Sequence, residues 1–133
     1  MALLFQDGDF VSHAGLPLAW KIECDAITDD EWRCLAKMIM GYQTKPFSKV
    51  VGIPRGGKKL EDALQPYCDT RTFNNHIGDI VNYPVLIVDD VYTTGTSFRE
   101  FREEHYLQQE VYQWCVFARR QPEDGVKALF TMP

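Results

Sequence analysis

Two adjacent acids stand at the end of an apolar run in "VLIVDDVYTTGTS", residues 85–97. Residues 85–88 are all apolar, which is typical of an interior parallel strand buried on both faces. Asp89 and Asp90 therefore come at the carboxyl end of a strand, where ligands bind in open α/β sheets. Carboxylates accept hydrogen bonds from vicinal hydroxyls and also bind Mg2+, directly or through water. We therefore expect this pair to bind a diol, a metal ion or both.

A turn rich in hydroxyls and glycine follows the acids and leads into a helix predicted at about 96–105. Its glycine permits backbone angles that a side chain would forbid. Free amides of the turn and of the helix N-terminus, with the hydroxyls, form a cup for an anion such as phosphate. Acids after a strand or hydroxyls in a loop could each be ordinary capping chemistry, but together they indicate a ligand with a phosphate beside ribose hydroxyls. The residues of this predicted phosphate loop are Thr93, Thr94, Gly95, Thr96 and Ser97.

The elements that must position these residues alternate along the chain. Two short strands within residues 3–27 are expected to form an N-terminal hairpin around "HAGLP", and Thr28 with Glu31 is typical of a helix N-terminus. From residue 49 onward, strands alternate with helices, which predicts a parallel α/β sheet with helices on both faces. We expect one domain over 1–133, with the hairpin at 1–27 and the α/β core at 28–133. Strands are predicted at 49–54, 84–90, 111–118 and 126–132, with a further short one within 68–75, and helices at 28–41, 58–67 and 96–105.

Composition narrows the class of protein. The chain has 133 residues, the size of one compact domain, and a net charge of -5, which argues against nucleic-acid binding. No apolar run approaches the roughly 20 residues that span a bilayer, and the N-terminus lacks the pattern of a signal peptide. Its cysteines have no metal-ligand spacing, so we expect free thiols in a reducing cytoplasm. From the charge and the short apolar runs we expect no nucleic-acid partner and no membrane partner. The cysteines are Cys24, Cys34, Cys68 and Cys115.

Residues 85–97 resemble the binding motif for phosphoribosyl pyrophosphate (PRPP) of the type I phosphoribosyltransferases. This resemblance implies a Rossmann-like parallel sheet flanked by helices, with a small β-hairpin hood at the N-terminus. It assigns the ribose hydroxyls to Asp89 and Asp90, which would also be the ligands of a Mg2+ cofactor. It assigns the 5-phosphate to residues 93–97.

A second stretch, "VVGIPRGGKK", resembles the pyrophosphate-binding loop of the same family. By that resemblance Arg55, Gly56 and Gly57 bind pyrophosphate, and an arginine suits this role because its guanidinium can grip two phosphate oxygens. Lys58 and Lys59 are nearby cations. Because the departing pyrophosphate carries the developing charge, Arg55 is also expected to be catalytic.

Within the family, the chain is most similar to the orotate phosphoribosyltransferases. Residues 8–20 resemble their hood strands, and in "YCDTR" Arg71 matches an arginine that contacts pyrophosphate, so it is the second expected catalytic residue. In "ARRQ", Arg120 matches an arginine that holds the orotate carboxylate, although Arg119 stands where that family has an aspartate. Thr93 replaces an aspartate of the purine-salvage enzymes, which favours an orotate-like pyrimidine as the accepting base.

The chain also departs from the family. Residues 58–84 are few for the helix, the strand and the long mobile loop that the family enzymes have there, and Pro17 replaces their hood lysine, leaving Lys21 as the nearest cation. Two functions stay open. The first is a phosphoribosyltransferase that uses PRPP and a nitrogenous base and forms a homodimer. The second is a non-catalytic PRPP-binding, nucleotide-binding or regulatory protein. A different Rossmann-like binder is less favoured, because "GIPRGG" does not match GxGxxG.

Overall fold

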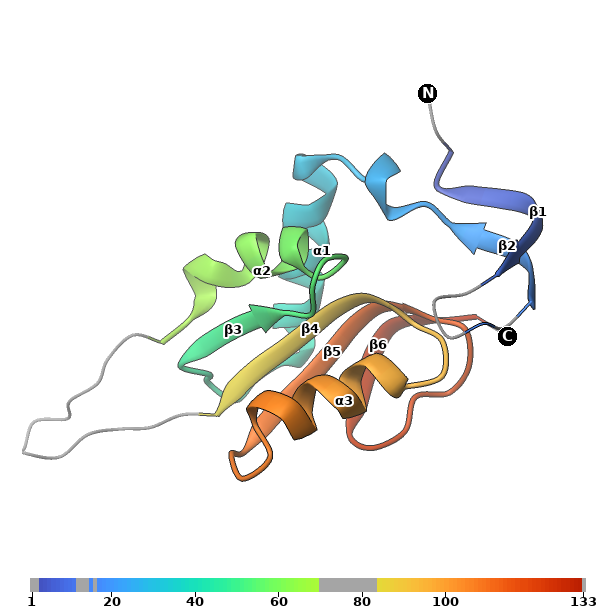
Figure 1. The fold of residues 1–133 in the computed structure, drawn as a ribbon. Helices are drawn as coiled ribbons and strands as arrows, with labels where there is room; N and C mark the ends of the chain where they lie inside the picture. The colour runs from blue at the N-terminus through green and yellow to red at the C-terminus, as the bar shows by residue number, and fades with distance from the viewer. Residues whose placement is uncertain (1–2, 12–14, 16, 70–83, 133) are drawn as a thin grey trace, which may run out of the picture.

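A parallel four-stranded sheet in the order β3-β4-β5-β6 forms the centre of the computed structural model (Figure 1). The model describes residues 3–11, 15, 17–69 and 84–132. The predicted parallel α/β sheet is confirmed. Its strands are β3 (Lys49–Gly52), β4 (Val85–Tyr92), β5 (Val111–Ala118) and β6 (Val126–Thr131). The helices are α1 (Asp29–Tyr42), α2 (Lys58–Leu64) and α3 (Thr96–His105), with short 3-10 turns η1 (Cys24–Ala26) and η2 (Gln65–Tyr67).

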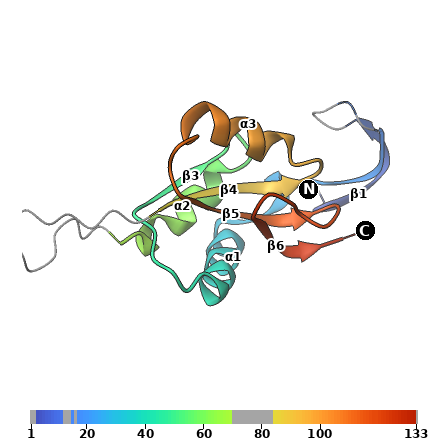
Figure 2. The ribbon, with the colours of Figure 1, turned by 90° about the horizontal axis from the view of Figure 1, so that it is seen from below.

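Helices cover both faces of this sheet, as expected. Figure 2 shows α3 on one side of the strands and α1 on the other. Side chains of a strand alternate between faces, so in β4 Leu86 and Val88 pack with residues of α1 and α2, while Val85 and Ile87 pack with Phe98 of α3. β4 is therefore buried on both faces along residues 85–88.

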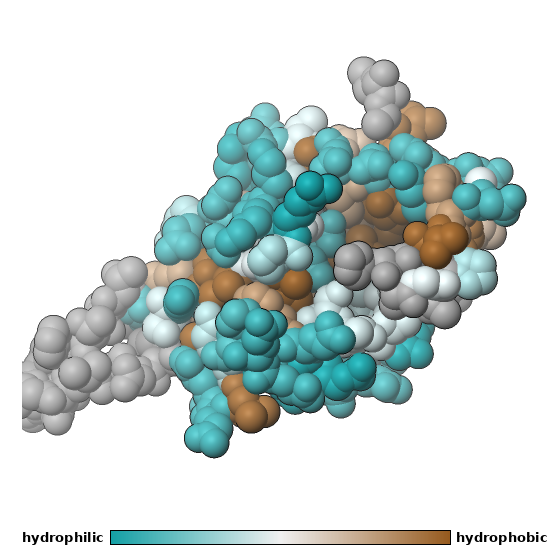
Figure 3. Space-filling view, in the orientation of Figure 1, coloured by the Kyte–Doolittle hydropathy of each residue, from teal (hydrophilic) through white to brown (hydrophobic). Residues whose placement is uncertain are grey.

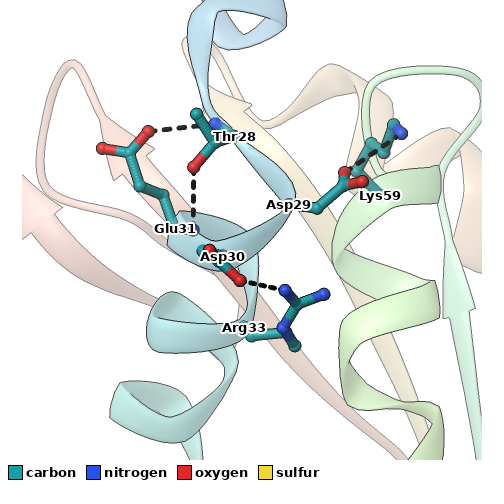
Figure 4. Close-up of polar contacts among 6 residues, drawn as sticks. All are labelled: Thr28, Asp29, Asp30, Glu31, Arg33 and Lys59. Atoms are coloured by element: carbon teal, nitrogen blue, oxygen red, sulfur yellow. Dashed lines mark hydrogen bonds and ion pairs between the residues drawn. The ribbon is translucent and has the colours of Figure 1, made fainter.

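The start of α1 is fixed by a capping box, which confirms Thr28 as the N-cap. The Thr28 amide donates to Glu31 Oε1 at 2.9 Å, and the Glu31 amide donates to Thr28 Oγ1 at 3.1 Å (Figure 4). One residue further, Asp29 Oδ1 lies 3.3 Å from Nζ of Lys59 in α2. The first turns of α1 and α2 are thereby joined. The segment between β3 and α2, residues 53–57, is called the glycine loop.

The predicted N-terminal hairpin is confirmed as β1 (Phe5–Val11) paired antiparallel with β2 (Pro17–Ile22), and we call it the hood. It lies beyond the carboxyl ends of the parallel strands (Figure 1). Arg119, directly after β5, attaches the hood to the core. Its Nη2 donates to the Trp20 carbonyl, and its guanidinium lies 3.8 Å from the centre of the Trp20 ring. Phe5 adds an edge-on ring contact with Phe117 of β5.

Two further expectations concern residues outside these elements. Cys68 and Asp69 are not in a strand, and the rest of the strand predicted within 68–75 lies outside the described residues. In the part of the chain that the structure describes, no helix is long and apolar enough to cross a bilayer.

Candidate functional site

The two acids lie near the carboxyl end of β4, as the sequence predicted, although the strand continues two residues beyond them to Tyr92. Asp89 is buried and lies beside Cys115, its register partner on the neighbouring strand β5, whereas Asp90 is half-buried. Asp89 Oδ1 accepts the Asp90 amide at 2.9 Å, and Asp90 Oδ1 accepts the Val91 amide at 2.7 Å. Each carboxylate is therefore oriented by the backbone that follows it.

Burial raises the pKa of Asp89 well above its usual range, and the neighbouring Asp90 charge raises it further. Two thiols stand against the pair. The pKa of Cys24, in η1, is raised by burial and then by the charge of Asp90, and the pKa of Cys115 is raised by burial and then by Asp89. Both thiols stay protonated at neutral pH, so neither adds charge or a nucleophile to the site.

The glycine loop after β3 is folded tightly against β4. The Ile53 amide donates to the Val88 carbonyl at 2.9 Å, and the Gly57 amide donates to the Ile53 carbonyl at 2.9 Å. A Cβ on Gly56 would lie 2.6 Å from Asp90 Oδ2, and one on Gly57 would lie 2.6 Å from the Val88 carbonyl oxygen. Only glycines allow this loop to approach the acids so closely, and that contact brings Arg55, which precedes them, to the same place.

The phosphate loop turns the chain from β4 into α3. Gly95 has φ +86, a left-handed conformation, and a Cβ there would lie 2.6 Å from the Tyr92 hydroxyl. Thr94 Oγ1 lies 2.9 Å from Thr96 Oγ1 and accepts the Thr96 amide at 3.4 Å. No acid stands in the first turn of α3, so the positive end of the helix dipole is open to an anion.

The acids, the glycine loop and the phosphate loop open on one cleft of about 1330 Å3. The hood closes its other side with Phe10, Leu18 and Ile22, and apolar surface gathers at the hood in Figure 3. Lys21 and Arg119 bring two cations to the same cleft. It therefore has an acidic centre, an anion-binding loop and an apolar end that carries cations.

The structure brings most of the predicted site residues together. The cleft is lined by Arg55, Gly56, Asp89, Asp90, Thr93, Thr94, Gly95, Thr96 and Ser97. Gly57 belongs to the glycine loop but packs against Ile53 and the Val88 carbonyl and does not line the cleft.

Lys58 and Lys59 do not line the cleft. Lys58 pairs with Glu61 and Lys59 with Asp29, each at 3.3 Å, so these lysines are held away from the cleft. Arg71 lies outside the described residues.

Arg120 is exposed, does not line the cleft, and donates through Nη2 to the Thr94 carbonyl at 2.8 Å. Sequence reasoning had instead passed over Arg119, which lines the cleft and whose pKa is lowered by burial. It had also passed over Tyr92, which is buried under Gly95. The position of Tyr92 shortly before the glycine of the turn was the sequence signal that could have identified it.

Within the described residues, no group of three or more His, Cys, Asp or Glu side chains is placed to hold a metal ion. Asp89 and Asp90 remain as two adjacent carboxylates. Mg2+ is commonly bound by one or two carboxylates together with water and the phosphate oxygens of a substrate. The donor set therefore fits Mg2+ bound together with a phosphorylated ligand.

Solved structures resemble this arrangement over nearly the whole chain. No protein-family model matches the chain, and neither does any curated protein sequence. Orotate phosphoribosyltransferase from Aeropyrum pernix is 19% identical, with a TM-score of 0.69 over 96% of this chain and 88% of that one. The Francisella tularensis enzyme of the same name is 17% identical, with a TM-score of 0.61 over 96% and 80%.

A longer protein contains the same architecture. UMP synthase from Leishmania donovani is 15% identical, with a TM-score of 0.74 over 96% of this chain, but this chain spans only 33% of that one. At such low identities the likeness lies in the course of the backbone, and it covers both the hood and the sheet. The chain has the fold of the type I phosphoribosyltransferases.

Proposed function

We propose that this protein is a phosphoribosyltransferase, which transfers the phosphoribosyl group of PRPP to a nitrogenous base and releases pyrophosphate. An orotate-like pyrimidine is the favoured base. The observation that carries the proposal is that the acid pair, the glycine loop and the phosphate loop all face one cleft. The ribose, the pyrophosphate and the 5-phosphate of PRPP need these three features side by side. The names of the similar structures, orotate phosphoribosyltransferase and UMP synthase, agree with it.

The acid pair would bind the ribose hydroxyls. The raised pKa of Asp89 favours its protonated form, and a protonated carboxyl can both donate to and accept from a hydroxyl. Asp90, fixed by the Val91 amide, would accept from the other hydroxyl. In the absence of Mg2+, this division of roles orients the sugar without placing two full negative charges against it. Bound Mg2+ would favour the ionised form of Asp89 and offset its charge.

Residues 93–97 would hold the 5-phosphate with amides and hydroxyls at the start of α3. Arg55, Gly56 and Gly57 would hold the pyrophosphate at the opposite side of the acids. When bound, Mg2+ would supply positive charge at the pyrophosphate oxygens, with Asp89 and Asp90 as its protein ligands. The loops thus fix both phosphorylated ends of PRPP, which leaves the anomeric carbon between them.

In the reaction, a ring nitrogen of the base, having lost its proton to water, forms a bond to the anomeric carbon while the bond to the pyrophosphate oxygen breaks. The bonding electrons leave with pyrophosphate, so cations near that oxygen lower the barrier. Arg55 lines the cleft and suits this role. The catalytic role of Arg71 and the contact of Arg120 with the base stay predictions from the resemblance, as do the homodimer and the cytoplasmic location.

The hood offers a place for the base. Phe10, Leu18 and Ile22 give the cleft an apolar wall, against which a flat heterocycle can pack. Arg119 on the same side favours a base that carries negative charge, whereas Lys21 there pairs with Glu23 at 3.3 Å.

Release of pyrophosphate tests the proposal. The protein should release it from PRPP only when both Mg2+ and a suitable base are present, and a panel of pyrimidines and purines would identify that base. The double variant Asp89→Asn/Asp90→Asn should lose this activity, whereas Asp62→Asn, on the exposed face of α2, should retain it. If no base in the panel supports release, the enzymatic proposal fails.

A second candidate is a protein that binds PRPP or a nucleotide without catalysis. Its support is the short connection to β4: η2 ends at Tyr67, and only residues 68–84 follow before the strand begins. A long mobile loop that excludes water would have little chain to form it. Calorimetry showing tight PRPP binding, with no pyrophosphate released by any base, would favour this candidate.

A further inference from the structure

The segment after β5 is hydrogen-bonded at three points to Tyr92 and to the phosphate loop that follows it. The Arg119 amide donates to the Tyr92 carbonyl at 2.9 Å, and Arg120 Nη2 donates to the Thr94 carbonyl at 2.8 Å. The Glu123 amide donates to the Tyr92 hydroxyl at 3.1 Å. Residues 119–123 therefore act as a brace on a loop that precedes them by more than 20 positions in the chain.

The bond from Arg120 has a directional consequence for the loop. The carbonyl of Thr94 and the amide of Gly95 belong to one planar trans peptide unit, so they point in opposite directions. Fixing the oxygen toward Arg120 fixes the Gly95 N–H away from it. Gly95 lines the cleft and Arg120 does not, so the arginine holds the peptide from the side opposite the ligand.

Tyr92 supports the same turn from below. Its side chain is buried, its ring lies 6.2 Å from that of Phe98, and its hydroxyl fills the space beside Gly95. The Glu123 amide fixes the position of that hydroxyl. The loop therefore rests on a buried ring while its outer carbonyl is held by a charged donor.

We propose that Arg120 is a positioning residue of the phosphate loop, acting through the Thr94 carbonyl. The inference rests on the proposed function, because it assumes that the loop binds the phosphate of a phosphoribosyl ligand. A hydrogen bond from a charged donor is stronger than one between two neutral groups. The orientation of the Gly95 amide, and with it the affinity for a phosphate monoester, should depend on this bond.

Calorimetry with ribose 5-phosphate and with pyrophosphate, each titrated separately, tests the role of Arg120. Arg120→Ala should weaken ribose 5-phosphate binding about tenfold and leave pyrophosphate binding unchanged, because pyrophosphate binds at the glycine loop. Arg120→Lys should restore most of the loss, since an ammonium can donate to the same carbonyl. The matched control is Arg33→Ala, which removes an exposed arginine of α1 that pairs with Asp30. Because Arg120 is exposed, all three variants should melt within a few degrees of the wild type.

Several outcomes overturn the proposal. If Arg120→Ala leaves ribose 5-phosphate binding unchanged, then the brace does not matter to the phosphate. An unchanged ribose 5-phosphate affinity with a raised KM for the base would instead place Arg120 at the base. Equal weakening of both ligands would indicate a general loss of structure or charge. If the wild-type protein binds no ribose 5-phosphate, then the proposed function itself fails, and this result is distinct from the others.

Discussion

Gly56 lies against the carboxylate of Asp90, and replacing this glycine with alanine should weaken binding of the ribose. The added Cβ would lie 2.6 Å from Oδ2 and 2.7 Å from Oδ1, whereas ordinary contact begins at 3.4 Å. Either the carboxylate or the glycine loop must therefore move by about 0.8 Å. Asp90 Oδ1 already accepts the Val91 amide at 2.7 Å, so a retreat of the carboxylate would stretch that bond.

The size of the effect follows from this displacement. A misplacement of about 1 Å in a site can cost about 100-fold. For Gly56→Ala we expect the Kd for ribose 5-phosphate to rise by about 10- to 100-fold, which corresponds to about 1.4–2.7 kcal/mol. The loop would also shift Arg55, so pyrophosphate binding should weaken in the same variant.

Calorimetric titration measures this effect, and α1 supplies a matched glycine. A Cβ on Gly41 would meet no atom within 4 Å, so Gly41→Ala should leave the Kd unchanged and stabilise the protein by about 0.5–1 kcal/mol. If Gly56→Ala binds ribose 5-phosphate as tightly as the wild type does, then contact between the glycine loop and Asp90 does not shape the ribose site, and the reasoning is refuted.

Three further predictions concern stability. Because the pKa of Asp89 is raised, the folded protein keeps a proton that the unfolded chain loses near pH 4. The free energy of unfolding should therefore fall as pH rises above 4, and Asp89→Asn should flatten this slope in urea titrations at several pH values. An unchanged slope would contradict the burial argument. Trp114 Nε1 donates to buried Gln43 Oε1 at 3.0 Å, so Trp114→Phe should cost at least about 1–3 kcal/mol in chemical unfolding, with Gln43→Leu in the same background recovering part of it. Thr28→Ala should lower the free energy of unfolding by about 1 kcal/mol, and a loss below a few tenths would mean that the capping box contributes little.

The sequence predicted those elements whose signals are local. The bounds of α3, residues 96–105, are those expected, because a glycine turn with hydroxyls precedes the helix and marks its start. The buried β4 strand and the Thr28 capping box were likewise predicted from runs of a few residues. The acid pair could be placed at a strand end because four consecutive apolar residues precede it.

Features that depend on distant segments could not be predicted in the same way. In "ARRQ" the sequence cannot tell which arginine faces the cleft, because neighbouring side chains at a strand end point in different directions. The structure sends Arg119 to the hood and Arg120 to the phosphate loop. The contact between Gly56 and Asp90 also joins residues far apart in the chain, and no spacing pattern encodes it.

The stacking of Arg119 on Trp20 gives the hood an optical label. The chain has three tryptophans; Trp32 and Trp114 are buried, whereas Trp20 is half-buried in the hood. A soluble quencher such as iodide or acrylamide should therefore reach Trp20 first, and the accessible part of the emission should report chiefly on the hood. Movement of the hood as the cleft fills could then be followed in solution by changes in quenching, without attaching a dye.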